Sequence, residues 1–186
     1  MKIHVYVSDL TRIAVMGICL SLLYPTNVRA DSSPTPNLMI TDQTVIVVPN
    51  HAKYNSVEIN GVPQPPSLRK APFGSGVGCP LYRTVKSPWL LNTSISLKKV
   101  FVLPAGATNL RISLSVDNDV TGITLNGNPN VVPGGITHEY CANVDEFLVY
   151  VPDVDLVAGN NILVIEANDR GGESFLDMRV LVDLPW

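Results

Sequence analysis

The chain has 186 residues, of which 16% are charged, and its formal net charge at pH 7 is −3. A mildly acidic chain lacks the basic surface that binds nucleic acid or anionic membranes, so neither is an expected partner. The length suits a single domain with a hydrophobic core of its own.

Residues 1–30 predict a cleaved secretory signal peptide. Lys2 and Arg12 precede an apolar run from Ile13 to Leu23, and Val28-Arg29-Ala30 fits a signal-peptidase site. The run is too short to span a membrane, so we expect no membrane insertion; a buried N-terminal helix is the alternative. Cleavage near Ala30 implies a secreted, periplasmic or cell-surface protein. The segment carries a net charge of +2, so the remaining chain has a net charge of −5.

After a flexible lead-in at residues 31–42, the pattern predicts one all-β domain over residues 43–186. Short apolar alternations separated by Gly, Pro and Asn-Gly turns are typical of strands, and no window keeps a helical period. The expected strands are Val45–Val48, Ser56–Ile59, Ile95–Leu103, Leu110–Val116, Ile123–Leu125, Phe147–Val151, Asn161–Ala167 and Phe175–Val182. The passage from Val62 to Trp89 is rich in Pro and Gly, which predicts irregular structure.

The stretch from Leu110 to Gly127 is the most informative part of the chain. Leu110–Val116 alternates apolar and polar residues, as expected of a strand with one buried face. Asp117-Asn118-Asp119 then predicts a corner, because a packed strand interior rarely holds three polar side chains in a row. A second strand ends in Asn126-Gly127, a strong hairpin-turn dipeptide.

Two cysteines follow the signal peptide, Cys79 and Cys141. In an oxidising compartment, one disulfide that closes this long loop is the simplest prediction. Two free thiols or an intermolecular bridge are the alternatives.

Four motifs resemble the galactose-binding-like jelly roll found in carbohydrate-binding modules. They are the run Phe101–Ile112, then Val116–Val120, then Leu125-Asn126-Gly127, and finally the Leu-x-x-Gly-x-Asn turn of Leu156–Asn161 with the strand after it. The resemblance covers residues 95 to 182. It implies a jelly-roll β-sandwich of two antiparallel sheets that binds ligands at loops at one end or on the concave face, and a structural calcium ion is common in this family.

Asp117, Asn118 and Asp119 are the candidate calcium ligands, because calcium prefers carboxylate and amide oxygens. The alternative is an acidic turn whose side chains cap nearby backbone amides. An EF-hand is excluded, since the chain has no Asp-x-Asp-x-Asp-Gly loop with its distant Glu.

Two further polar clusters are candidate sites. His138, Glu139, Cys141 and Asp145 are too few for zinc if Cys141 pairs with Cys79, so we interpret them as a polar loop. Asp169 and Arg170 border the Gly171-Gly172 turn with Glu173 and Asp177. Arg170 there either pairs with a carboxylate or binds sugar hydroxyls.

Sugar rings stack on exposed aromatic side chains, so Tyr82, Trp89 and Tyr140 are candidate ligand contacts. A disulfide between Cys79 and Cys141 would bring the two tyrosines together. For Trp89 the alternative is a core residue. The candidate ligand-binding set is Tyr82, Trp89, His138, Tyr140, Asp169 and Arg170.

No catalytic motif is present: the chain lacks a Gly-x-Ser-x-Gly elbow, a His-Glu-x-x-His pair and a phosphate-binding loop. The leading hypothesis is therefore a secreted, non-catalytic carbohydrate-binding module for a glycan or cell-surface polysaccharide. The alternative is a structural or adhesive protein that associates with itself or docks on a protein partner.

Overall fold

The computed structural model describes residues 43–76, 80–129, 135–139 and 145–185. The expected signal peptide and lead-in lie outside this part of the chain, as do Cys79, Tyr140 and Cys141. The predicted disulfide therefore stays a prediction.

The described residues confirm the all-β prediction. Their strands are β1 (Thr44–Val48), β2 (Ser56–Ile59), β3 (Val62–Pro63), β4 (Phe73–Ser75), β5 (Ser87–Pro88), β6 (Ser94–Leu103), β7 (Thr108–Leu125), β8 (Ile136–His138), β9 (Phe147–Tyr150), β10 (Gly159–Asn168) and β11 (Ser174–Asp183). Three short 3₁₀ turns accompany them, at Pro66–Leu68, Tyr82–Thr84 and Asp153–Asp155. The strands missed from sequence are β3, β4, β5 and β8, which have only two or three residues each.

The strands form one curled, mixed sheet that makes a half-barrel, with eight of them in the order β3-β2-β6-β10-β7-β11-β4-β5. Of the other three, β1 pairs with β11, and β8 and β9 pair with β7. The pairing of β4 with β5 is parallel, and the other pairings are antiparallel. The expectation of two separate antiparallel sheets is thus replaced by a continuous sheet. Its continuity comes from β7, which the sequence predicted as two strands.

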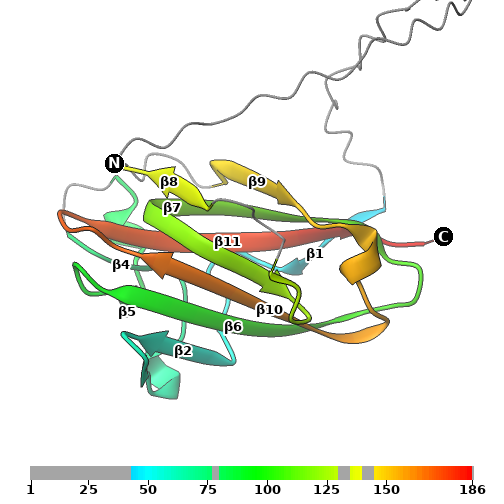
Figure 1. Cartoon of the computed structure of the whole chain (residues 1–186), viewed down its shortest axis with the longest axis horizontal. Coiled ribbons are helices and arrows are strands. Elements are labelled where there is room, and N and C mark those ends of the chain that lie inside the picture. The colour runs from blue at the N-terminus through cyan, green and yellow to red at the C-terminus, as the bar shows by residue number, and fades with distance from the viewer. Residues whose placement is uncertain (1–42, 77–79, 130–134, 140–144, 186) are drawn as a thin grey trace, which may run out of the picture. The chain divides into compact units, whose positions relative to one another are not determined.

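β7 joins two arms of the sheet, because its main partner changes along its length (Figure 1). One arm contains β2, β6 and β10, and the other contains β11, β4 and β5. Its first part pairs with β11, from Thr108 opposite Asp183 to Asp117 opposite Phe175. Its second part pairs with β10, from Asp119 opposite Asn168 to Leu125 opposite Leu163. The predicted corner at Asp117–Asp119 is the place where this exchange occurs, although the strand continues through it.

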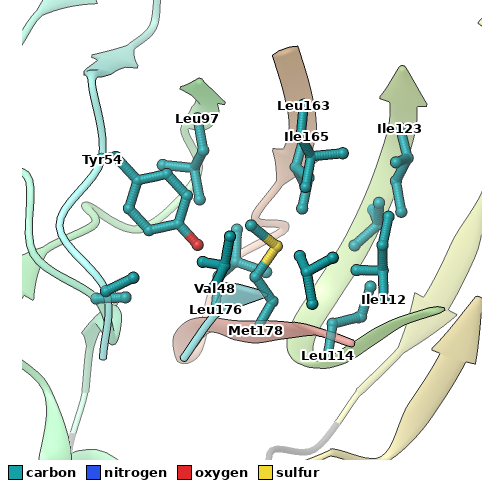
Figure 2. Close-up of a cluster of buried hydrophobic side chains, with 14 of the residues drawn as sticks. Val48, Tyr54, Leu97, Ile112, Leu114, Ile123, Leu163, Ile165, Leu176 and Met178 are labelled. Carbon is teal, nitrogen blue, oxygen red and sulfur yellow. The ribbon is translucent and has the colours of Figure 1, made fainter. Parts of the chain in front are cut away.

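The hydrophobic core lies between the two arms (Figure 2). Leu97 of β6 and Ile165 of β10 face Ile112 of β7 and Met178 of β11, and all four are buried. Fully burying a side chain of this size stabilises a fold by about 1.5–3 kcal/mol. The apolar alternation of each strand therefore fixes which face turns inward and which polar residues turn outward.

Candidate functional site

The acidic segment of β7 is held by protein groups. The Asn118 side-chain carbonyl accepts a hydrogen bond from the backbone N–H of Arg170 at 2.7 Å, and its amide donates to Asp117. Asp117 and Asn118 are only 3% and 7% exposed. Buried polar groups need such partners, which explains how a strand interior accommodates this segment.

Arg170 forms a two-pronged ion pair with Asp119. Its Nε lies 3.0 Å from Oδ2, and its Nη2 donates to Oδ1 at 3.2 Å. Nη1 also lies 3.5 Å from Glu139 Oε1. Of the two alternatives for Arg170, pairing with a carboxylate is therefore the one observed, and Asp119 is the partner.

Asp169 ties two loops together. Its Oδ2 accepts hydrogen bonds from the backbone N–H groups of Asn92 and Gly171. The side chain is 2% exposed, so it holds the turn between β10 and β11 against the loop before β6. This arrangement is a structural brace, and it leaves little of Asp169 open to a ligand.

Burial raises the pKa of Asp117 to about 6, with further contributions from the charges of Asp169 and Glu173. His138 and Arg170 act in the opposite direction. A carboxyl group in such surroundings favours its neutral form, because the charged form loses hydration and faces two like charges.

The expected calcium set receives no support from this geometry. Within the described ranges, no group of three or more His, Cys, Asp or Glu side chains is placed to hold a metal ion. The oxygens of Asp117, Asn118 and Asp119 already accept hydrogen bonds from Asn118 and Arg170. The alternative, in which these side chains bind nearby protein groups, describes the three residues better.

His138 is likewise engaged by its neighbours. Its Nδ1 lies 3.3 Å from the Val116 carbonyl oxygen, and its Nε2 lies 3.4 Å from Glu146 Oε1. Its ring meets the ring of Phe147 edge-on, with the centroids 5.2 Å apart. These contacts fix β8 against β7 and the start of β9.

The two candidate aromatic residues in the described ranges differ in exposure. Trp89 is fully buried, and its indole N–H donates to the Thr93 carbonyl at 3.2 Å, so its ring offers no face to a sugar. Its proposed role as a ligand contact is wrong for this structure, and the core alternative applies. Tyr82 is 41% exposed in the 3₁₀ turn Tyr82–Thr84, so its ring is accessible.

A polar hollow of about 350 Å³ lies on the outward face of the arm formed by β2, β6, β10 and the second part of β7. Its lining residues are Glu58, Gly61, Ser94, Ile95, Ser96, Thr121 and Glu166. A neighbouring hollow of about 280 Å³ is lined by Asp119, Val120, Thr121, Gly135 and Thr137. Thr121 belongs to both, so together they make a depression that crosses five strands.

Strand register builds this depression. Ser96 of β6 lies opposite Glu58 of β2 and opposite Glu166 of β10, and Glu166 lies opposite Gly122 of β7. Because residues in register share a face, these side chains form one row across the sheet. A Cβ at Gly122 would lie 3.2 Å from Glu166 Oε2, so this glycine leaves the space that the carboxylate occupies.

The sequence analysis missed this site, although Glu58, Ser96 and Glu166 occupy outward positions in predicted strands. Glu58, Ser96 and Glu166 are far apart in the chain and belong to no motif. Only the pairing of β2 with β6 and of β6 with β10 brings them together.

No protein-family model matches the chain, and searches for similar curated proteins and for similar solved structures found no match. None of the helical turns in the described ranges has the length and apolarity needed to cross a membrane.

Proposed function

We propose that the protein is a secreted, non-catalytic glycan-binding domain, related in fold to the galactose-binding-like jelly rolls, and that it binds its ligand on the outward face of β2, β6, β10 and β7. The observation that carries the proposal is the depression formed by the two hollows. Carboxylates and hydroxyls line it, and these groups hydrogen-bond to sugar hydroxyls.

The dimensions of the depression suit a short oligosaccharide. Neighbouring strands are spaced by about 4.8 Å, so the path from β2 to β8 extends over about 19 Å. Arg170 stands at the end near Asp119, where its exposed guanidinium is a further donor for a sugar hydroxyl.

The first experiment is a glycan-array screen of the purified protein, run with calcium and with chelator. Selective binding in both conditions supports the proposal, and loss of binding with chelator would show that binding depends on a metal ion. A silent array with folded protein would contradict the proposal.

A blocking variant then locates the site. We expect Ser96→Tyr to abolish binding, because a large side chain in the middle of the row fills the hollow. Val102→Tyr is the matched control, since Val102 lies on the same strand and face and is already 67% exposed. Equal loss of binding in both variants would contradict the location.

The second candidate function is docking on a protein partner or self-association, and a separate hollow favours it. This hollow of about 340 Å³ is lined by Ile59, Asn60, Val62, Gln64, Pro88, Leu90 and Thr93. Val62 and Leu90 are 61% and 58% exposed, so two apolar side chains of this hollow are accessible to a partner. Pro63 and Pro88 occupy the two terminal strands and disfavour strand addition, so side-chain docking is the favoured mode.

Sedimentation of the wild type and of Leu90→Asp tests this second function. If the protein associates through this hollow, the wild type sediments as an oligomer and the variant as a monomer. A monomeric wild type would remove the support for self-association.

A further inference from the structure

Positive charge is concentrated in one part of the chain. Residues 43–99 carry seven Lys and Arg side chains against one acidic residue, Glu58, whereas residues 100–186 carry three against twelve. The net charge of −3 for the whole chain averages over this separation. None of the seven cations takes part in the ion pairs found among the described residues.

Four of the seven cations lie together where the segments before β2 and β4 meet β6. We call Lys53, Arg69, Lys70 and Lys99 the basic cluster. Lys53 and Lys70 form an antiparallel bridge, which is flanked on both sides by backbone hydrogen bonds between the same two segments. These two lysines are exposed and directly opposite each other, a position in which Cβ atoms are about 4.5–5.5 Å apart and like charges are destabilising.

Neutral groups hold the other two cations in place. The Nε and Nη1 atoms of Arg69 donate to the backbone carbonyls of Gln64 and Asn55, each at 2.8 Å. Lys99 Nζ donates to the Lys53 carbonyl at 2.7 Å. A carbonyl does not neutralise the positive charge, and both side chains keep further N–H donors. The basic cluster therefore presents fixed, uncompensated cations with donors available to a ligand.

We propose that the basic cluster is a second binding site, separate from the hollow, and that it holds the sulfate or carboxylate groups of an anionic polysaccharide. An anionic group between Lys53 and Lys70 replaces their mutual repulsion with attraction. The cations donate charge-assisted hydrogen bonds to it, which are about twice as strong as neutral ones. The site goes beyond the proposed function, because the ligand is recognised by its charge rather than by its hydroxyls.

A nucleic acid fits the basic cluster less well than a polysaccharide. Sites for single strands combine cations with aromatic rings on which bases stack. The aromatic residue next to Lys53 is Tyr54, which is 3% exposed and points into the core (Figure 2). The basic cluster therefore offers charge without a ring for stacking.

The test compares dextran sulfate with dextran, which share a backbone and differ in charge, by isothermal titration calorimetry with the purified full-length protein. We expect dextran sulfate to bind at least tenfold more tightly, and its binding to weaken as salt is added, because salt screens exposed charges. Alginate identifies the anionic group. Binding of alginate as well supports a site for carboxylates and sulfates alike, and binding of dextran sulfate alone supports a site for sulfate. Equal affinity for dextran sulfate and dextran would overturn the proposal.

Three variants assign the binding to the basic cluster. Lys53→Gln and Lys70→Gln should each weaken dextran sulfate binding about tenfold, the effect of losing one charge-assisted hydrogen bond. Neither should lower the melting temperature, because each removes one of two opposed like charges. Arg83→Gln is the matched control; it removes an exposed cation of the turn Tyr82–Thr84, outside the cluster, and should change binding less than twofold.

The remaining outcomes decide between a site and a general charge effect. Equal losses in all three variants would show that binding follows net charge, and would overturn the site. A DNA duplex that binds as tightly as dextran sulfate, with the same dependence on Lys53 and Lys70, would overturn the polysaccharide assignment. Unchanged dextran sulfate binding in Ser96→Tyr supports a site separate from the hollow, and loss of binding there would overturn that separation. A lower melting temperature in both lysine variants would show that the lysines stabilise the fold, and would overturn the argument from their repulsion.

Discussion

The two arms of the sheet both carry polar side chains on the face that points away from the core, but only one of them uses these side chains internally. On β7 and β11, the polar residues Arg111, Ser113, Asp177 and Arg179 all have protein partners. We call this surface the paired face. On the other arm, Glu58, Ser96 and Glu166 line an open hollow, and we call that surface the open face.

The contrast teaches that charge and polarity alone do not identify a site. Arg111 is 5% exposed, and its Nη2 lies 2.7 Å from Asp183 Oδ1. Asp177 is 1% exposed and accepts a hydrogen bond from the backbone N–H of His51 at 3.1 Å. Groups bound in this way stabilise the fold, whereas groups that lack protein partners are available to a ligand.

The largest expected effect is at Trp89, which the sequence analysis named as a candidate ligand contact. Trp89→Ala should destabilise the protein by about 3–5 kcal/mol, because it removes a fully buried indole from the core. Tyr82→Ala, at an exposed position, should change the stability by less than about 1 kcal/mol. Urea denaturation of both variants measures the difference, and similar losses would contradict the assignment of Trp89 to the core.

The next effect compares Arg111 of β7 with Arg170 in the turn between β10 and β11. Arg111→Met leaves Asp183 without its buried partner and should cost about 2–3 kcal/mol of folding free energy. Arg170→Met breaks an ion pair whose arginine side chain is 44% exposed, and it should cost less than about 1 kcal/mol. Chemical denaturation distinguishes them, and a larger loss for Arg170→Met would contradict the assignment of the larger structural contribution to Arg111.

The smallest effect is a pH dependence at the exchange point of β7. The pKa of Asp117 is raised from 3.8 to about 6 in the folded protein, so the folded state binds the proton more tightly than the unfolded state. Protonation of Asp117 therefore stabilises the folded state. This stabilisation is fully present below pH 3.8 and is lost as the pH rises to about 6.

Asp117→Asn removes this loss and keeps an oxygen that accepts from the Asn118 amide. We expect the variant to be more stable than the wild type at neutral pH by about 1 kcal/mol. Denaturation from pH 4 to 8 in chelator follows the difference between the two proteins. A difference that is constant over this range, or a variant that is less stable at neutral pH, would contradict the raised pKa of Asp117.

The sequence predicted the strands well where alternation was long. The core faces of β6, β7, β10 and β11 follow directly from period-two patterning, which dictates the side that each residue takes. Two features could not be predicted from this patterning, for physical reasons. Asp117-Asn118-Asp119 stays in strand because hydrogen bonds from a distant turn, at Arg170, satisfy it.

The open face was the second feature to escape, because its residues meet only through register. Periodicity shows that Ser96 and Glu166 point outward, but not that they lie opposite each other. In contrast, the residues that looked most like a site in the sequence were clustered along the chain. Asp117, Asp169 and His138 turned out to hold loops and strands in place.

The most direct test of the central claim is to map backbone amide chemical shifts during titration with the oligosaccharide that the glycan array selects. The account predicts shifts concentrated at Glu58, Ser96, Thr121 and Glu166, with the paired face of β7 and β11 unchanged. Shifts centred on the paired face, or on Val62 and Leu90, would contradict the claim that the open face is the binding site.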